Sequence, residues 1–134
     1  MAAPVAFPDA EAAIITHVRD QLAALGAPVP VSGRVPNPVP TRHVRIVRTG
    51  GLRRDLITDR ARLTFECRDS SGAPGAVELA RLVRAIVTNA PGYMGGAWVD
   101  VAAEVGGPAF SPDPDTGTAR YLLTVELHMR GSEL

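Results

Sequence analysis

Residues 43–68 read HVRIVRTGGLRRDLITDRARLTFECR, a segment that predicts two strands joined by a polar turn. The strands are expected at His43–Thr49, which is rich in β-branched residues, and at Ala61–Arg68, where apolar and polar side chains alternate. Residues 50–60 between them hold two glycines and several charged side chains. We therefore expect a long hairpin whose tip, residues 50–60, is far more polar than the strands that lead to it.

A second pair of strands is predicted downstream, at Ala97–Val105 and Ala119–Arg130, because apolar and polar residues alternate in both stretches. Residues 106–118, GGPAFSPDPDTGT, connect them. This connection exceeds the about two to five residues usual in a hairpin, and a loop of that length is more often functional or mobile than idle.

Two helices are predicted on either side of the first hairpin. Asp9–Leu25 carries apolar residues at spacings of three and four, with Asp9 as the N-cap and Gly26 as the stop. A second helix is expected over Ala76–Ala90, ended by Pro91 and Gly92. Residues 27–41 contain five prolines and predict an extended connector, with room for a short strand near Val29–Val35.

These elements predict a single domain, residues 1–134, of the α+β class with the order α-β-β-α-β-β. Two helices would pack on one face of a four- to five-stranded, mostly antiparallel sheet and form a two-layer structure. The other face of the sheet would meet water or a partner. Its expected residues are Arg45, Arg62, Glu66, Asp100, Arg120 and Glu126, together with Val47, Trp98 and Leu122.

The charges are balanced in number and uneven along the chain. The 14 basic residues, all arginines, equal the 14 acidic ones, which argues against nucleic-acid binding by bulk charge. Eight arginines lie between Arg34 and Arg62 against Asp55 and Asp59, so this stretch carries a charge of +6 and the remainder −6. Such a division suits head-to-tail contacts between identical copies. A solvated basic hairpin explains the charge pattern equally well.

No residue pattern predicts catalysis, a cofactor or a metal. His17, His43 and His128 are mutually distant, and Cys67, the only cysteine, lies on the apolar phase of its strand. Phosphate-binding and nucleophile-elbow motifs are missing. Asp113 and Asp115 are spaced like the first ligands of a calcium loop, but the remaining ligands do not follow, so a rigid turn is expected. The chain has no apolar run long enough for a membrane span, and residues 1–13 lack signal-peptide features, which makes synthesis in a reducing cytoplasm the expectation.

Several segments together resemble a known family. VPTRHVRIVRTGGLRRD (Val39 to Asp55), LTFEC (Leu63 to Cys67), LARLVRAI (Leu79 to Ile86) and VGGPAFSPDPDTGTARYLLTVELHMRG (Val105 to Gly131) are similar, in this order, to tail-terminator proteins of long-tailed bacteriophages, particularly actinobacterial phages. These proteins are also described as minor tail or head-to-tail joining proteins. The similarity extends over nearly the whole chain. It departs at Arg68, where an aromatic residue would be expected after Glu66 and Cys67.

The resemblance implies a structural virion protein and no enzyme. Such a subunit forms a ring, commonly hexameric, on the head-proximal end of the tail tube, where it ends tube growth and meets the head connector or stopper protein. Genomic DNA would pass through the lumen without sequence-specific binding. Assembly would take place in the host cytoplasm. We expect the ring or tube contacts at and beside the hairpin tip and the 106–118 loop, at Arg45, Arg48, Gly50, Gly51, Arg53, Arg54, Asp113, Asp115, Gly117 and Arg120.

Two other functions fit the same residues. Another neck component, such as a head-completion or stopper protein, would also be a small ring-forming subunit. A small ligand-binding domain or enzyme would need a closed, apolar-lined pocket that holds titratable residues such as Glu126 or His128.

Overall fold

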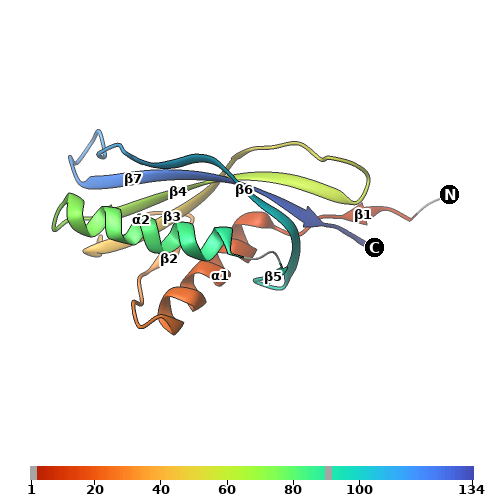
Figure 1. Ribbon diagram of the computed structural model, residues 1–134, viewed down its shortest axis with the longest axis horizontal. Coiled ribbons are helices and arrows are strands. Elements are labelled where there is room, and N and C mark those ends of the chain that lie inside the picture. Colours follow the sequence, from red (N-terminus) through yellow and green to blue (C-terminus); the bar gives the residue numbers. More distant parts are fainter. Residues whose placement is uncertain (1–2, 90–91) are drawn as a thin grey trace.

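The computed structural model describes residues 3–89 and 92–134. Within these residues the chain forms two helices and eight strands (Figure 1). In chain order they are β1 (Val5–Ala6), α1 (Ala10–Ala24), β2 (Val31–Ser32), β3 (Arg42–Gly50), β4 (Thr58–Asp69), α2 (Ala73–Thr88), β5 (Gly92–Met94), β6 (Ala97–Phe110), β7 (Ala119–Arg130) and β8 (Ser132–Glu133).

Six of the strands form one curled sheet in the order β2-β3-β4-β7-β6-β5. Strand β2 is parallel to β3, and the other neighbours are antiparallel. The centre of the sheet is the β4–β7 pair, which runs without interruption from Thr58 opposite Arg130 to Asp69 opposite Ala119. A second sheet, of two strands, joins β1 to β8 at one end of the molecule.

The predicted fold, an α+β two-layer domain with four or five strands in the order α-β-β-α-β-β, is wrong. The main sheet has six strands, β2 makes it mixed, and β1 and β8 form a separate sheet. The short strand expected near Val29–Val35 is present as β2, whereas β1, β5 and β8 were not predicted, because strands of two or three residues are too short for alternation to show in the sequence. Strand β5 folds back on β6 through Gly95 and Gly96, which both have positive φ. A pair of glycines is typical of hairpin turns, so the sequence contains a signal for this strand.

The longer elements follow the predictions. Helix α1 has Asp9 as its N-cap, whose carboxylate accepts a hydrogen bond from the Ala12 N–H at 3.1 Å. Both predicted hairpins form, as β3–β4 and β6–β7. The predicted loop 106–118 is shorter, because β6 continues to Phe110 with register shifts against β7. The predicted end of the second helix at Ala90 and Pro91 lies outside the described residues.

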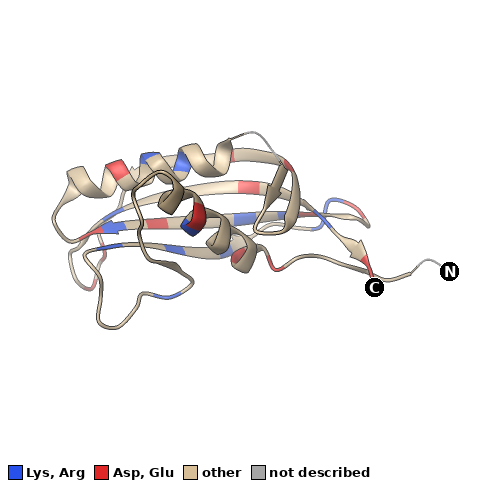
Figure 2. Ribbon diagram, turned by 90° about the horizontal axis from the view of Figure 1, so that it is seen from below, with Lys and Arg blue, Asp and Glu red and all other residues tan. Residues whose placement is uncertain are grey.

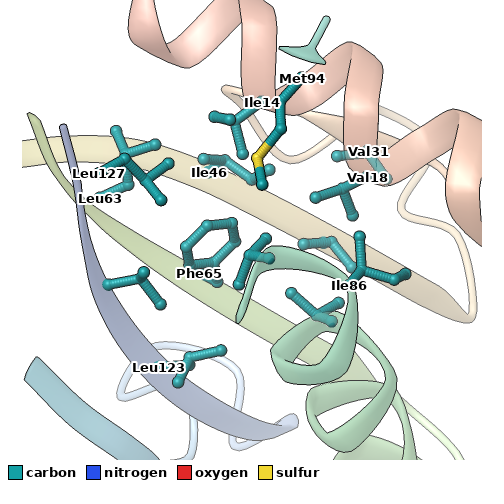
Figure 3. Close-up of a cluster of buried hydrophobic side chains, with 14 of the residues drawn as sticks. Ile14, Val18, Val31, Ile46, Leu63, Phe65, Ile86, Met94, Leu123 and Leu127 are labelled. Atoms are coloured by element: carbon teal, nitrogen blue, oxygen red, sulfur yellow. The ribbon is translucent and has the colours of Figure 1, made fainter. Parts of the chain in front are cut away.

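The hydrophobic core lies between the helices and one face of the sheet (Figure 3). Alternate residues of β4 point into it, and Phe65 lies at its centre with no solvent exposure. Ile14 and Val18 of α1 and Val83 of α2 cover the strands and are equally buried. Because strand side chains alternate between faces, the residues between these positions lie on the opposite, polar face. No helix in the described ranges is both long enough and apolar enough to cross a membrane.

Candidate functional site

The polar face of the sheet carries charged residues in register with one another. Arg45 of β3 lies opposite Glu66 of β4, and Arg62 of β4 lies opposite Glu126 of β7. Figure 2 shows positive and negative residues distributed together along the strands. Cross-strand pairs of opposite charge stabilise a sheet. Much of the charge on this face is therefore paired within the subunit.

Glu66 is the centre of an ion-pair cluster at one end of this face. Its Oε2 accepts a hydrogen bond from Arg45 Nη1 at 2.6 Å. Its Oε1 lies 2.9 Å from Arg68 Nη2 and 3.4 Å from Arg120 Nη1. Three guanidinium groups from three neighbouring strands thus share one carboxylate that is only 7% exposed. A cluster buried to this degree holds the strands together, since removing one partner leaves a buried charge without compensation.

Asp113 brings the loop between β6 and β7 onto this cluster. Its Oδ2 lies 3.1 Å from Arg68 Nη2, and its Oδ1 accepts the backbone N–H of Asp115 at 2.9 Å. These hydrogen bonds, first of all the one from Asp115, hold the pKa of the Asp113 carboxyl below its ordinary value, with Arg68 adding to the effect. Gly117, with φ +73°, closes the turn by donating its N–H to the Asp113 carbonyl at 2.8 Å. Asp113 and Asp115 thus form part of a hydrogen-bonded turn, as the sequence predicted.

A pocket of about 340 Å³ lies beside the cluster, between two loops. Val35, Val39 and Pro40 come from the proline-rich segment, and Thr116 and Thr118 from the β6–β7 loop. We call it the loop pocket. His43 and Arg68 line it from the sheet. The pocket is thus apolar on one side and polar on the other.

His43 is fully buried at this pocket, although its position on β3 belongs to the polar face. Its Nε2 lies 2.8 Å from the Ser32 hydroxyl, which comes from the parallel strand β2. Burial, the largest effect, and the neighbouring Arg68 together lower the pKa of His43 to about 4, against the opposing effect of Glu66. The imidazole is therefore neutral at pH 7 and acts as part of the packing.

The opposite end of the hairpin is organised by Arg48 and Asp59. The guanidinium makes two hydrogen bonds to the carboxylate, Nη1 to Oδ2 at 2.7 Å and Nη2 to Oδ1 at 2.9 Å. This hydrogen bonding raises the pKa of Arg48. Its Nε also donates to the Gly50 carbonyl at 3.0 Å, and its backbone N–H donates to Glu11 Oε1 at 3.0 Å. Arg48 therefore ties helix α1 and the hairpin together.

Residues 51–57, which we call the tip loop, extend beyond this ion pair. Gly51 has φ +92°, and a Cβ there would collide with the Arg60 carbonyl oxygen, so glycine is required where the chain turns away from β3. Three large aliphatic side chains of the loop are exposed, Leu52 at 76%, Leu56 at 71% and Ile57 at 53%. Arg54 pairs with Asp55 at the surface, whereas Arg53 is exposed and has no ion pair among the described residues.

The predicted interface residues therefore divide into two groups. Arg45, Asp113, Asp115, Gly117 and Arg120 lie in or beside the Glu66 cluster. Arg48, Gly50, Gly51, Arg53 and Arg54 lie at the other end of the sheet (Figure 1). Arg45 and Arg48 are only three residues apart on β3, about 10 Å at roughly 3.3 Å per residue, whereas the tip loop and the β6–β7 loop lie beyond opposite ends of β4. Arg45, Arg48 and Arg120 are bound to carboxylates inside the subunit, which leaves the loops as the accessible part of each group.

Sequence reasoning missed the central roles of Glu66 and Arg68 and the apolar character of the tip loop. Glu66 and Arg68 alternate with core residues, as the residues of any solvent-facing strand face do. Only the register with β3 and β7 shows that their charges lie close to those of neighbouring strands. The exposed aliphatic residues had a signal in the sequence, because Leu52, Leu56 and Ile57 interrupt an otherwise polar tip.

Strand β6 carries a third group of exposed apolar side chains, with Val101 at 38%, Val105 at 48% and Phe110 at 54% exposure.

The remaining titratable groups are dispersed. His128 Nε2 lies 3.1 Å from Glu126 Oε1, and Glu126 also receives Arg62, so the pKa of this carboxyl is lowered. Burial raises the pKa of the Cys67 thiol to about 12. Among residues 3–89 and 92–134, no three His, Cys, Asp or Glu side chains are grouped to hold a metal ion. No model of a protein family and no curated protein matches this sequence.

Proposed function

We propose that this chain is a tail-terminator subunit of a long-tailed bacteriophage, a structural virion protein that forms a ring on the head-proximal end of the tail tube. One observation carries the proposal beyond the sequence resemblance. Exposed aliphatic side chains lie at both ends of an elongated subunit, in the tip loop and at the loop pocket. Exposed apolar clusters of this kind favour contacts with other proteins, and different surfaces at opposite ends favour a head-to-tail ring.

The proposed mechanism is capping. A tube polymer grows as long as its end presents the surface that the next ring of tube subunits binds. A terminator ring, hexameric by resemblance, covers that surface and presents a different one to the head connector or stopper protein. No covalent chemistry is required. The division of the subunit into a rigid sheet and protruding loops supports this role, because the sheet can hold the loops in fixed positions around a ring.

Genomic DNA would pass through the lumen of this ring without sequence-specific binding. The pairing of arginines with carboxylates supports this part of the proposal, because paired guanidinium groups neutralise few phosphates. The polar face thus offers a passing duplex little net attraction.

Electron microscopy of the purified chain mixed with tail tubes tests the proposal. We expect a ring of extra density on one end of each tube and an arrest of further tube growth. Uncapped tubes that continue to grow in the presence of excess protein would refute it. In phage, loss of a terminator should give overlong or unjoined tails. Loss of a stopper protein, the nearest alternative function, should give heads that leak DNA beside tails of normal length.

A double charge reversal, Arg53→Glu with Arg54→Glu, addresses the tip loop. Both side chains are exposed and neither contributes to the core, so the monomer should remain folded. We expect ring or tube association to weaken, as measured by light scattering and by phage yield. Unchanged association together with unchanged yield would remove these two residues from the interface.

A further inference from the structure

We infer that the tip loop of one copy of this chain docks in the loop pocket of the next copy. The occupant of the pocket is thus a second copy of the same protein, and its contacts are aliphatic side chains and one ion pair. This inference rests on the proposed ring and specifies which surfaces of neighbouring subunits meet.

The apolar parts of the two surfaces complement each other. The tip loop presents Leu52, Leu56 and Ile57, each more than half exposed. The pocket presents an apolar wall whose most exposed residue, Val39, is 66% accessible. A volume of about 340 Å³ is at the lower end of the range that takes a small ligand, and is suited to aliphatic side chains entering from outside. Docking would remove both groups from water.

The unpaired charges of the two surfaces are opposite in sign. Arg53 on the tip loop and Asp115 on the loop beside the pocket are both exposed, and neither makes an ion pair within residues 3–89 or 92–134. Arg34, which precedes Val35 of the pocket wall, is also exposed and has the same sign as Arg53. The tip loop would therefore enter with Arg53 on the side of Asp115, which fixes the orientation of the contact.

The positions of the two surfaces decide what kind of assembly follows. The tip loop and the loop pocket lie at opposite ends of the β4–β7 pair, so one subunit cannot satisfy its own contact. Each copy offers one tip and one pocket, which gives a heterologous interface that closes into a ring when the rotation allows it. Both surfaces are held in place before contact, the tip by Arg48 and Asp59 and the pocket by Arg68 and Asp113. Prior ordering reduces the entropic cost of association.

A charge exchange tests the ion pair, with assembly followed by sedimentation velocity over a range of concentrations. Arg53→Glu and Asp115→Arg should each raise the concentration needed for half-assembly by about tenfold. The double variant should recover most of the loss, because it restores an opposite pair. Arg81→Glu on the exposed face of α2 is the matched control and should assemble as the wild type does. Two single variants that assemble normally, or a double variant weaker than both, would overturn the inference.

Cysteine cross-linking tests the apolar contact independently. Val39→Cys with Leu56→Cys should give intermolecular disulfides under mild oxidation, in species that stop at the size of the ring. The native Cys67 is buried and its pKa is raised, so it should not react. Rings that form without cross-links would overturn the docking and leave the proposed capping intact. A wild-type chain that stays monomeric at every concentration would also overturn the docking, and tube capping would then be judged by electron microscopy alone.

Discussion

Among single residues, Asp59 has a strongly held partner, because its carboxylate forms a partly buried ion pair with Arg48. Asp59 is 6% exposed, and the arginine makes two hydrogen bonds to it. Asp59→Asn keeps the size of the side chain but leaves the guanidinium without its counter-charge. We expect the free energy of unfolding, measured by urea denaturation, to fall by about 2–3 kcal/mol.

The matched control for this prediction is Asp55→Asn. Asp55 also pairs with an arginine, Arg54, but both side chains are nearly half exposed. An exposed pair of this kind contributes about 0–1 kcal/mol. Equal losses for the two variants would show that burial does not distinguish the pairs.

His43 should make the stability of the protein depend on pH. The unfolded chain binds a proton at this residue below about pH 6.5, whereas the folded chain does so only near pH 4. The unfolded state therefore binds more protons between these values, and the free energy of unfolding should fall as pH drops from 6.5 to 4, by about 2 kcal/mol. Urea denaturation at pH 7 and pH 4.5 measures this fall.

His43→Gln isolates the contribution of this residue, because glutamine has no charge to gain. The pKa of His17 is also lowered by burial, with the same sign, but His17 remains in both proteins. The variant should therefore lose less stability than the wild type over the same interval. An identical loss in both proteins would assign the pH dependence to other groups.

At the scale of elements, the exit from β3 into the tip loop depends on Gly51. Gly51→Ala should lower the free energy of unfolding by about 2 kcal/mol or more, since the φ of +92° is strained for alanine and its Cβ meets the Arg60 backbone. Gly106→Ala is the control, because a Cβ at that position of β6 enters open space. Chemical denaturation of both variants compares them. A neutral result at Gly51 would mean that the tip loop is free to adopt another path.

The elements differ in how far the sequence predicts them. Apolar and polar residues alternate over Ala61–Arg68 of β4 and along β6 and β7, and β3 is rich in β-branched residues, so these four strands could be predicted. Strands β1, β2, β5 and β8 have only two or three residues, and they form by tertiary contact: β2 and β5 pair with the free edges of β3 and β6, and β1 pairs with β8. The same limit applies to the candidate site. The sequence places Arg45 and Glu66 on one face, but only strand register brings them within 2.6 Å.

Across the whole molecule, folding neutralises part of the charge division along the chain. Of the eight arginines between Arg34 and Arg62, five make ion pairs with residues that the structure describes. Three of their partners, Glu66, Asp69 and Glu126, come from outside this stretch. These three pairs neutralise half of the separation of +6 and −6 within one subunit. The charge left to attract a neighbouring copy is correspondingly smaller, so we expect apolar contacts to dominate association.

This balance predicts how assembly responds to salt. Between about 0.1 M and about 1 M ionic strength the Debye length falls from about 10 Å to about 3 Å, which screens the remaining exposed pairs. We expect this change to weaken ring association by less than about tenfold, because a single solvent-exposed ion pair contributes little. Leu56→Asp at low salt should weaken association by more than about tenfold, since it places a charge within the apolar contact. Sedimentation velocity measures both effects. Rings that dissociate fully in salt while Leu56→Asp assembles normally would show that charge drives association.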